Sequence, residues 1–197
     1  MEKTLMFATG NLHKLDEIRS ILPEFKILGL KDIGIDMDIP ETGSTLEENA
    51  YIKANFLFNY TGVPVLSEDT GLEVNCLNGA PGVHTARFAG ENKNPDANIS
   101  KLLQLMIHEQ DRNAQFRTVI AYVTQNNTSY FEGIVKGKIA LSKSGNGGFG
   151  YDPVFIPDGY DSTFADLDPK IKNKISHRAN AVKKMIGFLL SENSSQQ

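Results

Sequence analysis

The first residues of the chain change from strand-like to helix-like spacing, and this change constrains the fold more than any other feature. Residues 5–8 form the short apolar run of a buried strand, and residues 9–11, Thr-Gly-Asn, are turn residues. Apolar residues then recur at helical spacing up to Pro23, at Leu12, Leu15, Ile18 and Leu22. A strand, a turn and a helix in this order predict a mixed α/β protein.

Two further helices have clear start signals. Ser44 and Glu47 fit a capping box, and it opens a helix whose apolar face comprises Leu46, Ala50, Ala54 and Leu57. Asn94 followed by Pro95 predicts an N-cap with proline at the first helical position, and the buried stripe of that helix comprises Ile99, Leu102, Leu103 and Met106. The last helix is expected to begin with Ser176 as its N-cap.

A hairpin is expected between the third and last helices. Residues 116–124 and 130–141 are rich in β-branched and aromatic side chains, and the polar residues 125–128 separate them. The polar residues 191–197 are expected to form a disordered tail. We therefore expect one domain over residues 1–190, or two closely joined lobes, followed by that tail.

Composition excludes several classes of protein. The chain has 197 residues, 40% of them hydrophobic and 22% charged, which is typical of a soluble globular protein. No segment is apolar enough to cross a bilayer, and no leader is evident, so a cytoplasmic protein is expected. One cysteine, Cys76, rules out an internal disulfide, and a net charge of −4 argues against binding to a nucleic-acid polymer.

Two adjacent carboxylates stand at what looks like the end of a buried strand. Residues 67–72 read Ser-Glu-Asp-Thr-Gly-Leu and follow the apolar residues 63–66. Adjacent negative charges repel and are costly to desolvate, so Glu68 and Asp69 indicate a bound cation or a proton-transfer task. The same residues also suit a solvated Asp-Thr-Gly turn.

Three other loops have compositions that a core does not require. Residues 9–14 offer backbone N–H groups at a helix N-terminus and the ammonium of Lys14, which suits phosphate binding, but they also suit a plain helix start capped by Asn11. Residues 172–178 gather basic side chains where a helix dipole disfavours them, which indicates a nearby anion or ligand acceptor; the alternative is a solvated basic patch.

The remaining loop, residues 145–153, begins with a match to G-x-G-x-x-G at residues 145–150 but lacks the context of a dinucleotide-binding fold. Residues 151–156 continue into a strand-like run, so no helix N-terminus is expected there to bind a pyrophosphate. The glycines allow close approach of the backbone to a ligand, and Phe149 offers a face for stacking on a base. The alternative is a flexible loop with Phe149 in the core.

Together these loops resemble the inosine triphosphate pyrophosphatase family, which hydrolyses noncanonical purine nucleoside triphosphates. The resemblance rests on TGNLHK, ETG, SEDTGLEV, GAPGVHTARFAG, GGFGYDPVF and KNKISHR, which occur in the order of the family along nearly the whole chain. It implies an elongated two-lobed α/β fold around a long mixed sheet, with the active cleft between the lobes, and a homodimer. It also implies Mg²⁺-dependent hydrolysis of ITP, dITP or XTP to the monophosphate and pyrophosphate.

The resemblance further implies roles for individual residues. Asp69 would accept a proton from water, and Glu41 with Asp69 would hold Mg²⁺. The phosphates would be bound by Thr9, Gly10, Asn11, Leu12, His13 and Lys14. The substrate would also contact Thr70, Phe149, Gly150, Tyr151, Asp152, Lys172, His177 and Arg178. We expect His177 and Arg178 to donate hydrogen bonds to the 6-oxo group of the base, where adenine carries an amino group instead.

Two residues depart from the pattern of the family. His84 stands where an aromatic tyrosine is usual, which leaves the role of its loop open, and Glu68 replaces an aspartate with the charge kept. Two alternatives remain at this point. One is a Maf-like pyrophosphatase that acts on other nucleotides, and the other is a non-catalytic nucleotide-binding protein.

Overall fold

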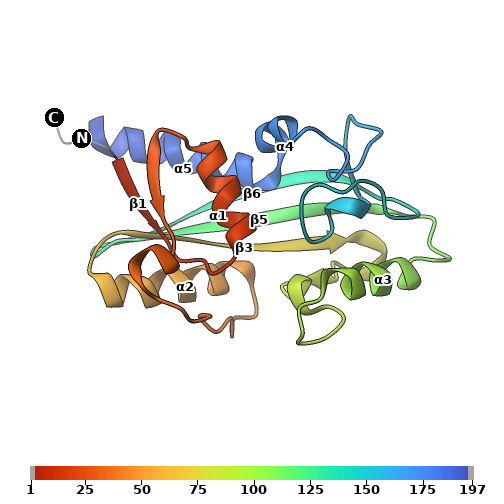
Figure 1. Ribbon diagram of the computed structural model, residues 1–197, viewed down its shortest axis with the longest axis horizontal. Coiled ribbons are helices and arrows are strands. Elements are labelled where there is room, and N and C mark those ends of the chain that lie inside the picture. The colour runs from red at the N-terminus through yellow and green to blue at the C-terminus, as the bar shows by residue number, and fades with distance from the viewer. Residues whose placement is uncertain (1–2, 195–197) are drawn as a thin grey trace. The chain divides into compact units, whose positions relative to one another are not determined.

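The structure is a computed structural model that describes residues 3–194 (Figure 1). Its strands are β1 (Lys3–Phe7), β2 (Phe25–Leu28), β3 (Val65–Val74), β4 (Pro81–Gly82), β5 (Asn113–Val123), β6 (Thr128–Ile139) and β7 (Phe155–Pro157). Its α-helices are α1 (Leu12–Ile21), α2 (Leu46–Thr61), α3 (Pro95–Leu105), α4 (Pro169–Ile175) and α5 (His177–Ser194). None of these helices has the length and apolar character needed to cross a membrane.

The strands form one mixed sheet in the order β2-β1-β3-β5-β6-β7, with β4 paired to β3. β1 is parallel to both β2 and β3, whereas β3 with β4 and β6 with β7 are antiparallel. The neighbouring β5 and β6 are joined by a short connection in which the N–H of Thr124 donates to the carbonyl of Asn127. The predicted α/β class, mixed sheet and pairing of these two segments are thus confirmed.

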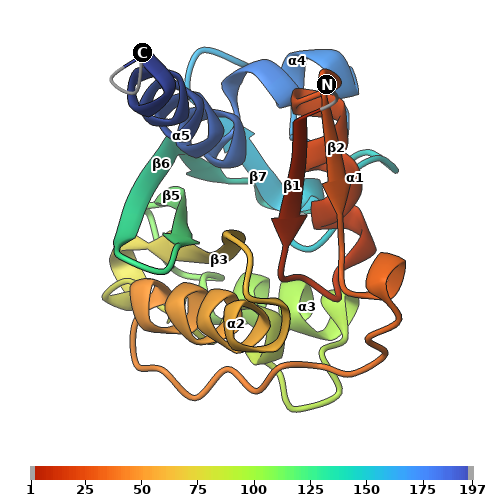
Figure 2. The same ribbon diagram turned by 90° about the vertical axis from the view of Figure 1, so that its left-hand side faces the viewer.

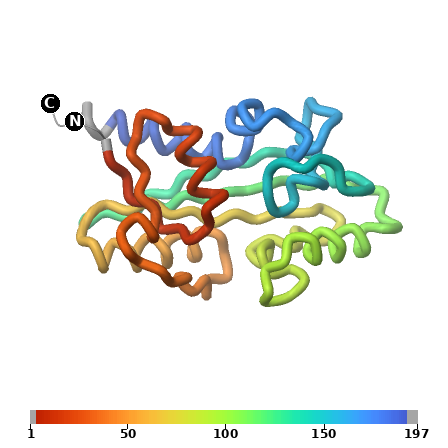
Figure 3. The backbone as a smooth tube through the Cα atoms, viewed as in Figure 1, coloured from red at the N-terminus to blue at the C-terminus, as the bar shows by residue number. Residues whose placement is uncertain are grey.

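The chain divides into two compact units, each with its own core. Unit 1 comprises residues 1–69, 118–133 and 178–197, and unit 2 comprises residues 70–117 and 134–177. The tube in Figure 3 follows the course of the chain, and within unit 1 it shows the last helix beside the N-terminal strand. Because β3, β5 and β6 each contribute residues to both units, the units are not successive domains along the chain.

In unit 1, helices cover both faces of the sheet. Alternate strand residues point to opposite faces, so Leu66 packs in a cluster with α1 and α5, while Val65 packs in a second cluster with α2. Figure 2 shows α2 below β3 and α5 above it. The residues that α1 and α5 bury include Leu15, Ile18, Val182 and Met185, and those that α2 buries include Ala50, Ala54 and Leu57.

In unit 2, α3 and the segment around β7 enclose a separate core. Ile99, Leu102 and Met106 of the α3 region pack against strand residues, as their helical spacing predicts. The aromatic side chains in this core are Phe116, Tyr151, Phe155 and Phe164. The glycine-rich residues 145–150 lead into a 3₁₀ turn at Asp152–Val154 and then β7, which confirms that no dinucleotide-binding helix follows them.

Several predicted boundaries are wrong by small amounts. The N-cap of α2 is Thr45, whose hydroxyl accepts from the N–H of Glu48, one residue later than predicted. Residues 172–178 are not a loop, because Lys172 lies in α4. α5 begins at His177, directly after Ser176, so the predicted start of the last helix is confirmed. α5 continues through Ser194, so the tail predicted from residue 191 starts too early, and residues 195–197 lie outside the described part of the chain.

Candidate active site

The adjacent carboxylates Glu68 and Asp69 lie within β3 and not at its end. The strand runs without interruption from Val65 to Val74, which corrects the prediction of a loop at residues 67–72. Successive strand side chains point to opposite faces. The two carboxylates therefore belong to different environments in unit 1, Glu68 on the face with α1 and α5 and Asp69 on the face with α2.

Glu68 is fully buried and is neutralised by basic groups of the protein. The Nε and Nη2 atoms of Arg178 donate to its two oxygens at 2.8 and 2.6 Å, and the Nζ of Lys14 lies 3.4 Å from Oε1. Burial alone would raise the pKa of Glu68, but the charges of Arg178 and Lys14 lower it to about 2. Arg178 also donates to Glu17 of α1, so one guanidinium joins α5, β3 and α1.

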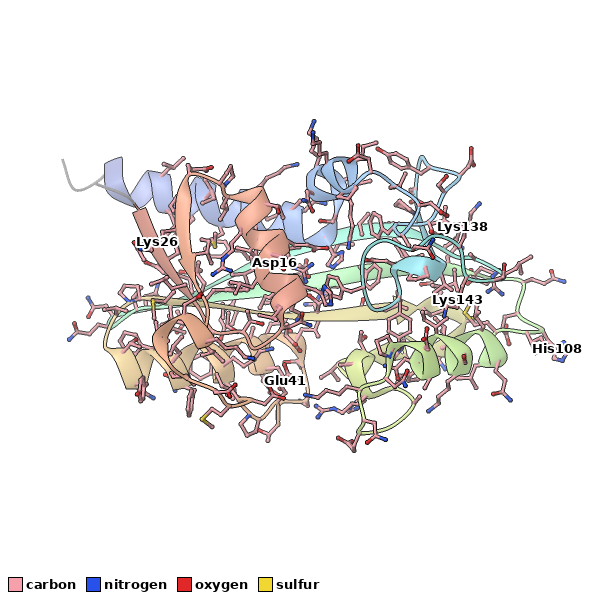
Figure 4. All side chains as sticks on the ribbon, in the orientation of Figure 1. Asp16, Lys26, Glu41, His108, Lys138 and Lys143 are labelled. Carbon is pink, nitrogen blue, oxygen red and sulfur yellow. The ribbon has the colours of Figure 1, made fainter. Side chains whose placement is uncertain are left out.

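On the other face, Lys53 of α2 brings Glu41 and Asp69 together. Its Nζ lies 2.5 Å from Oε1 of Glu41 and 3.1 Å from Oδ1 of Asp69. Figure 4 shows Glu41 on the segment that precedes α2. Burial would lower the pKa of Lys53, but the carboxylates of Asp69 and Glu41 outweigh this effect and raise it. Lys53 is therefore a buried ammonium held between two carboxylates.

Asn49 fixes the second oxygen of Asp69. Its amide nitrogen donates to Oδ2 of Asp69 at 3.3 Å, and its amide oxygen accepts from the N–H of Gly43 at 2.8 Å. Asn49 therefore connects the segment of Glu41 to β3. Burial raises the pKa of Asp69, Glu41 acts in the same direction, and Lys53 opposes both. A carboxylate with a raised pKa is a better proton acceptor near neutral pH.

Residues 9–14 connect β1 to the first turn of α1, and Lys14 links this segment to Glu68. Asn11 caps the helix by accepting from the N–H of Lys14 at 3.2 Å, and the N–H of Asn11 donates to the Thr9 hydroxyl at 3.2 Å. Gly10, Leu12 and His13 are exposed, and Lys14 turns toward Glu68. The plain helix cap is present, and the exposed backbone of the same loop is available to a ligand.

A second group of predicted residues gathers in unit 2 around Asp152. Oδ2 of Asp152 accepts from Nζ of Lys172 at 2.5 Å and from the N–H of Phe149 at 2.7 Å. The Lys172 ammonium also lies 4.9 Å from the centre of the Phe149 ring. Lys172 and Asp152 are almost completely buried, whereas Phe149 and Gly150 are half-buried. This arrangement offers an aromatic face beside a buried cation.

Two other predicted residues of unit 2 are buried in supporting positions. The imidazole of His177 stacks on Phe116, with ring centres 4.7 Å apart and planes at 20°. The hydroxyl of Tyr151 donates to the carbonyl of Thr85 at 3.0 Å, and burial raises the pKa of Tyr151 above its ordinary value. Tyr151 therefore joins the glycine-rich loop to residues 81–90, which include the exposed His84. Thr70 follows Asp69 in β3 and is half-buried.

Sequence reasoning missed the residues of unit 1 that bind Glu41 and Asp69 or connect to Glu68 through Arg178. Lys53, Asn49 and Glu17 belong to helices and were not singled out. The available signal was that Asn49 and Lys53 occupy the buried face of α2 among Leu46, Ala50, Ala54 and Leu57. Polar side chains on a buried helical face require partners, which is a reason to suspect a site.

Glu41 and Asp69 are the carboxylates suited to a metal. Among residues 3–194, no group of three or more histidine, cysteine, aspartate or glutamate side chains could hold a metal ion. The pair already shares one cation, Lys53, so the position favours positive charge. Mg²⁺ commonly takes only one or two carboxylates and completes its shell with phosphate oxygens and water, so the pair fits this ion.

Comparison with known proteins gives a consistent result. The sequence matches the Ham1 family over residues 5–188. It is 52% identical to a dITP/XTP pyrophosphatase of Porphyromonas gingivalis, with 96% of this chain and 98% of that protein covered. The Ham1 protein of Staphylococcus aureus is similar in structure, with a TM-score of 0.87, 42% identity and coverage of 96% of this chain and 100% of that one. A HAM1 protein from Coxiella burnetii also has a TM-score of 0.87, at 37% identity and with coverage of 96% and 99%.

Proposed function

Because the chain belongs to the Ham1 family, we propose that it is a nucleoside triphosphate pyrophosphatase that removes noncanonical purine nucleotides from the nucleotide pool. Its relatives at 41–52% identity are dITP/XTP pyrophosphatases, and they match over nearly their whole length. The reaction would add water across the bond between the α- and β-phosphates of dITP, XTP or ITP and release the monophosphate and pyrophosphate. The observation that carries the proposal is the arrangement of the buried Asp69 and Lys53 with the half-buried Glu41.

Asp69 is the proposed proton acceptor for the attacking water. Lys53 and Asn49 hold its two oxygens in a fixed orientation, and burial raises its pKa. A positioned base of this kind commonly contributes about 10²- to 10⁴-fold to the rate. The proton taken from water would pass to Asp69 and then to solvent as the pyrophosphate leaves.

Glu41 and Asp69 would hold Mg²⁺ in this proposal. The bound ion would supply charge neutralisation at the phosphate oxygens and help to activate water. Lys53 already occupies a position between the two carboxylates, so its ammonium would have to share them with the ion or turn toward a phosphate oxygen. Dependence on a divalent cation follows, since the ammonium alone leaves one of the two negative charges uncompensated.

The phosphates would be bound by residues 9–14. The exposed backbone at the start of α1 offers N–H groups, and the helix dipole favours negative charge there. Lys14 would move from its long contact with Glu68, at 3.4 Å, to a phosphate oxygen. Arg178 keeps Glu68 neutralised when this happens, because it holds both carboxylate oxygens.

The residues around Asp152 are proposed to bind the base. Phe149 offers its ring for stacking, and Lys172 is a buried donor suited to the 6-oxo group of hypoxanthine or xanthine. The stacking of His177 on Phe116 fixes the plane of its imidazole, which suits a donor to the base. Donation by Arg178 to the base stays a prediction, because the contacts seen for its guanidinium are with Glu68 and Glu17.

We further propose a homodimer that acts in the cytoplasm, where nucleoside triphosphates are made and consumed. The support for the dimer is membership of the family, and light scattering at several concentrations tests it. A monomeric mass across the concentration range would contradict it.

Pyrophosphate release from ITP, dITP, XTP, GTP, ATP and dTTP, with and without Mg²⁺, tests the activity. We expect the first three to be hydrolysed in Mg²⁺ and all rates to vanish after exhaustive EDTA treatment. Preference for dTTP would favour the Maf-like alternative. Binding of the triphosphates without turnover would favour a non-catalytic nucleotide-binding protein.

A further inference from the structure

The loop that carries Phe149 is poorly suited to hold one conformation by itself. Residues 141–148 are exposed, and residues 145–150 contain four glycines. Gly145, Gly148 and Gly150 have φ values of +83°, +69° and +60°, which glycine adopts without strain. Such a segment loses much conformational entropy when it is fixed. Presentation of the Phe149 ring to a base therefore requires an external support.

Residues 163–165 provide that support at the start of the loop and at the turn that follows it. The carbonyl of Ala165 accepts from the N–H of Gly147 at 3.0 Å, and the N–H of Ala165 donates to the carbonyl of Asp152 at 3.3 Å. Contact at Gly145 is so close that a Cβ there would lie 2.4 Å from the carbonyl carbon of Ala165. Two residues of the loop, Gly145 and Gly147, and Asp152 just after it therefore contact the backbone of Ala165.

Thr163 adds a side-chain hydrogen bond to Ser144, the residue directly before the loop. It is 2% exposed, and its hydroxyl donates to the carbonyl of Ser144 at 2.9 Å. The same hydroxyl lies 3.1 Å from Oδ2 of the exposed Asp166. A hydroxyl has one proton to donate, so Asp166 competes with Ser144 for it.

We propose that Thr163 is a positioning residue for base recognition, which acts by fixing Ser144 and through it the loop that presents Phe149. This inference rests on the proposed function, because Phe149 is the proposed stacking partner of the base. Thr163 itself would not touch the nucleotide. Its loss would weaken binding of the base and leave the contacts of the phosphates unchanged.

The test compares Thr163→Val, which keeps the shape and removes the hydroxyl, with Thr163→Ser, which keeps the hydroxyl. We expect Thr163→Val to raise KM for dITP by about 3- to 10-fold, the range for loss of one neutral hydrogen bond. kcat should change by less than about 2-fold, because the lost interaction stabilises the bound substrate and the transition state equally. Inhibition by inorganic tripolyphosphate, which has no base, should be unchanged. Thr163→Ser should match the wild type.

Asp166→Ala provides a matched control because it removes the competing acceptor from an exposed position. Its KM should equal or fall below that of the wild type; an increase as large as that of Thr163→Val would overturn the proposal. Unchanged KM in Thr163→Val, or a loss confined to kcat, would also overturn it.

Hydrogen exchange separates this inference from the proposed function. Backbone amides of residues 145–150 should exchange faster in Thr163→Val than in Thr163→Ser, whether or not the wild type hydrolyses dITP. An inactive wild type would contradict the proposed function. Equal exchange in the two variants would contradict the claim that the Thr163 hydroxyl fixes the loop.

Discussion

Glu68 and Asp69 are consecutive residues of β3, yet each is bound by a different set of basic side chains on opposite faces of the strand. Arg178 and Lys14 neutralise Glu68, and Lys53 binds Asp69. The sequence suggested two charges that share one cation or one proton. The structure instead separates a carboxylate with a pKa of about 2 from one whose pKa is raised. This separation supports the proposal that Asp69 is the base, whereas Glu68 stays ionised near neutral pH.

Replacement of Asp69 by asparagine tests the proposed base. The amide is nearly isosteric but accepts no proton, so kcat for dITP should fall by about 10²-fold or more. Circular dichroism and the melting temperature should remain close to those of the wild type, since Lys53 keeps its contact with Glu41. Asp161→Asn, at an exposed position, is the control and should have full activity. Wild-type activity of Asp69→Asn would make Asp69 a structural residue.

Lys53→Met tests whether the position between Glu41 and Asp69 favours a cation. Without the ammonium the carboxylates repel, so the melting temperature in EDTA should fall by about 5 °C. Added Mg²⁺ should stabilise this variant more than the wild type, since the ion binds only the folded carboxylate pair. Lys31→Met, which removes an exposed contact with Asp36, should change neither value. Equal responses of variant and wild type to Mg²⁺ would argue against metal binding by this pair.

The ion pair of Glu68 predicts a specific dependence of stability on pH. Its pKa is about 2 in the folded protein and 4.5 as the ordinary value, so its contribution is complete above pH 4.5 and is lost as the pH falls through 2. The full difference corresponds to about 3 kcal/mol. Between pH 6 and pH 3, the free energy of unfolding should therefore fall by about 2 kcal/mol more in the wild type than in Glu68→Gln. Urea denaturation at the two pH values measures this, and parallel losses would contradict the assignment.

Local patterns predicted much of the fold, and long-range contacts account for most of what they missed. The cap at Asn11 and the proline start of α3 depend on neighbouring residues and were found. The partner of Glu68 lies 110 residues away, so no spacing rule could pair it with Arg178. Residues 67–72 contain aspartate and glycine, which are rare in strands, yet pairing and burial keep them in β3.

The same limit applies to the candidate site, where the predicted roles of the residues stay predictions. Glu41 and Asp69 do lie together, as the resemblance implied, but the ammonium that joins them belongs to a helix whose pattern looked purely apolar. The buried hydroxyl of Tyr151 is bound to Thr85, and the predicted contact of Tyr151 with substrate stays a prediction. Thr163 lies outside every loop that composition singled out, and only the folded chain shows that it supports the glycine-rich one.

Identification of the products of dITP and dATP in the presence of Mg²⁺ tests the central claim most directly. Phosphorus NMR distinguishes dIMP and pyrophosphate from dIDP and phosphate. We predict that dITP gives only dIMP and pyrophosphate, and that kcat/KM for dITP exceeds that for dATP by about 30-fold or more, because adenine leaves the donors at the 6-position unpaired. Formation of dIDP and phosphate, or equal kcat/KM for the two nucleotides, would contradict the account.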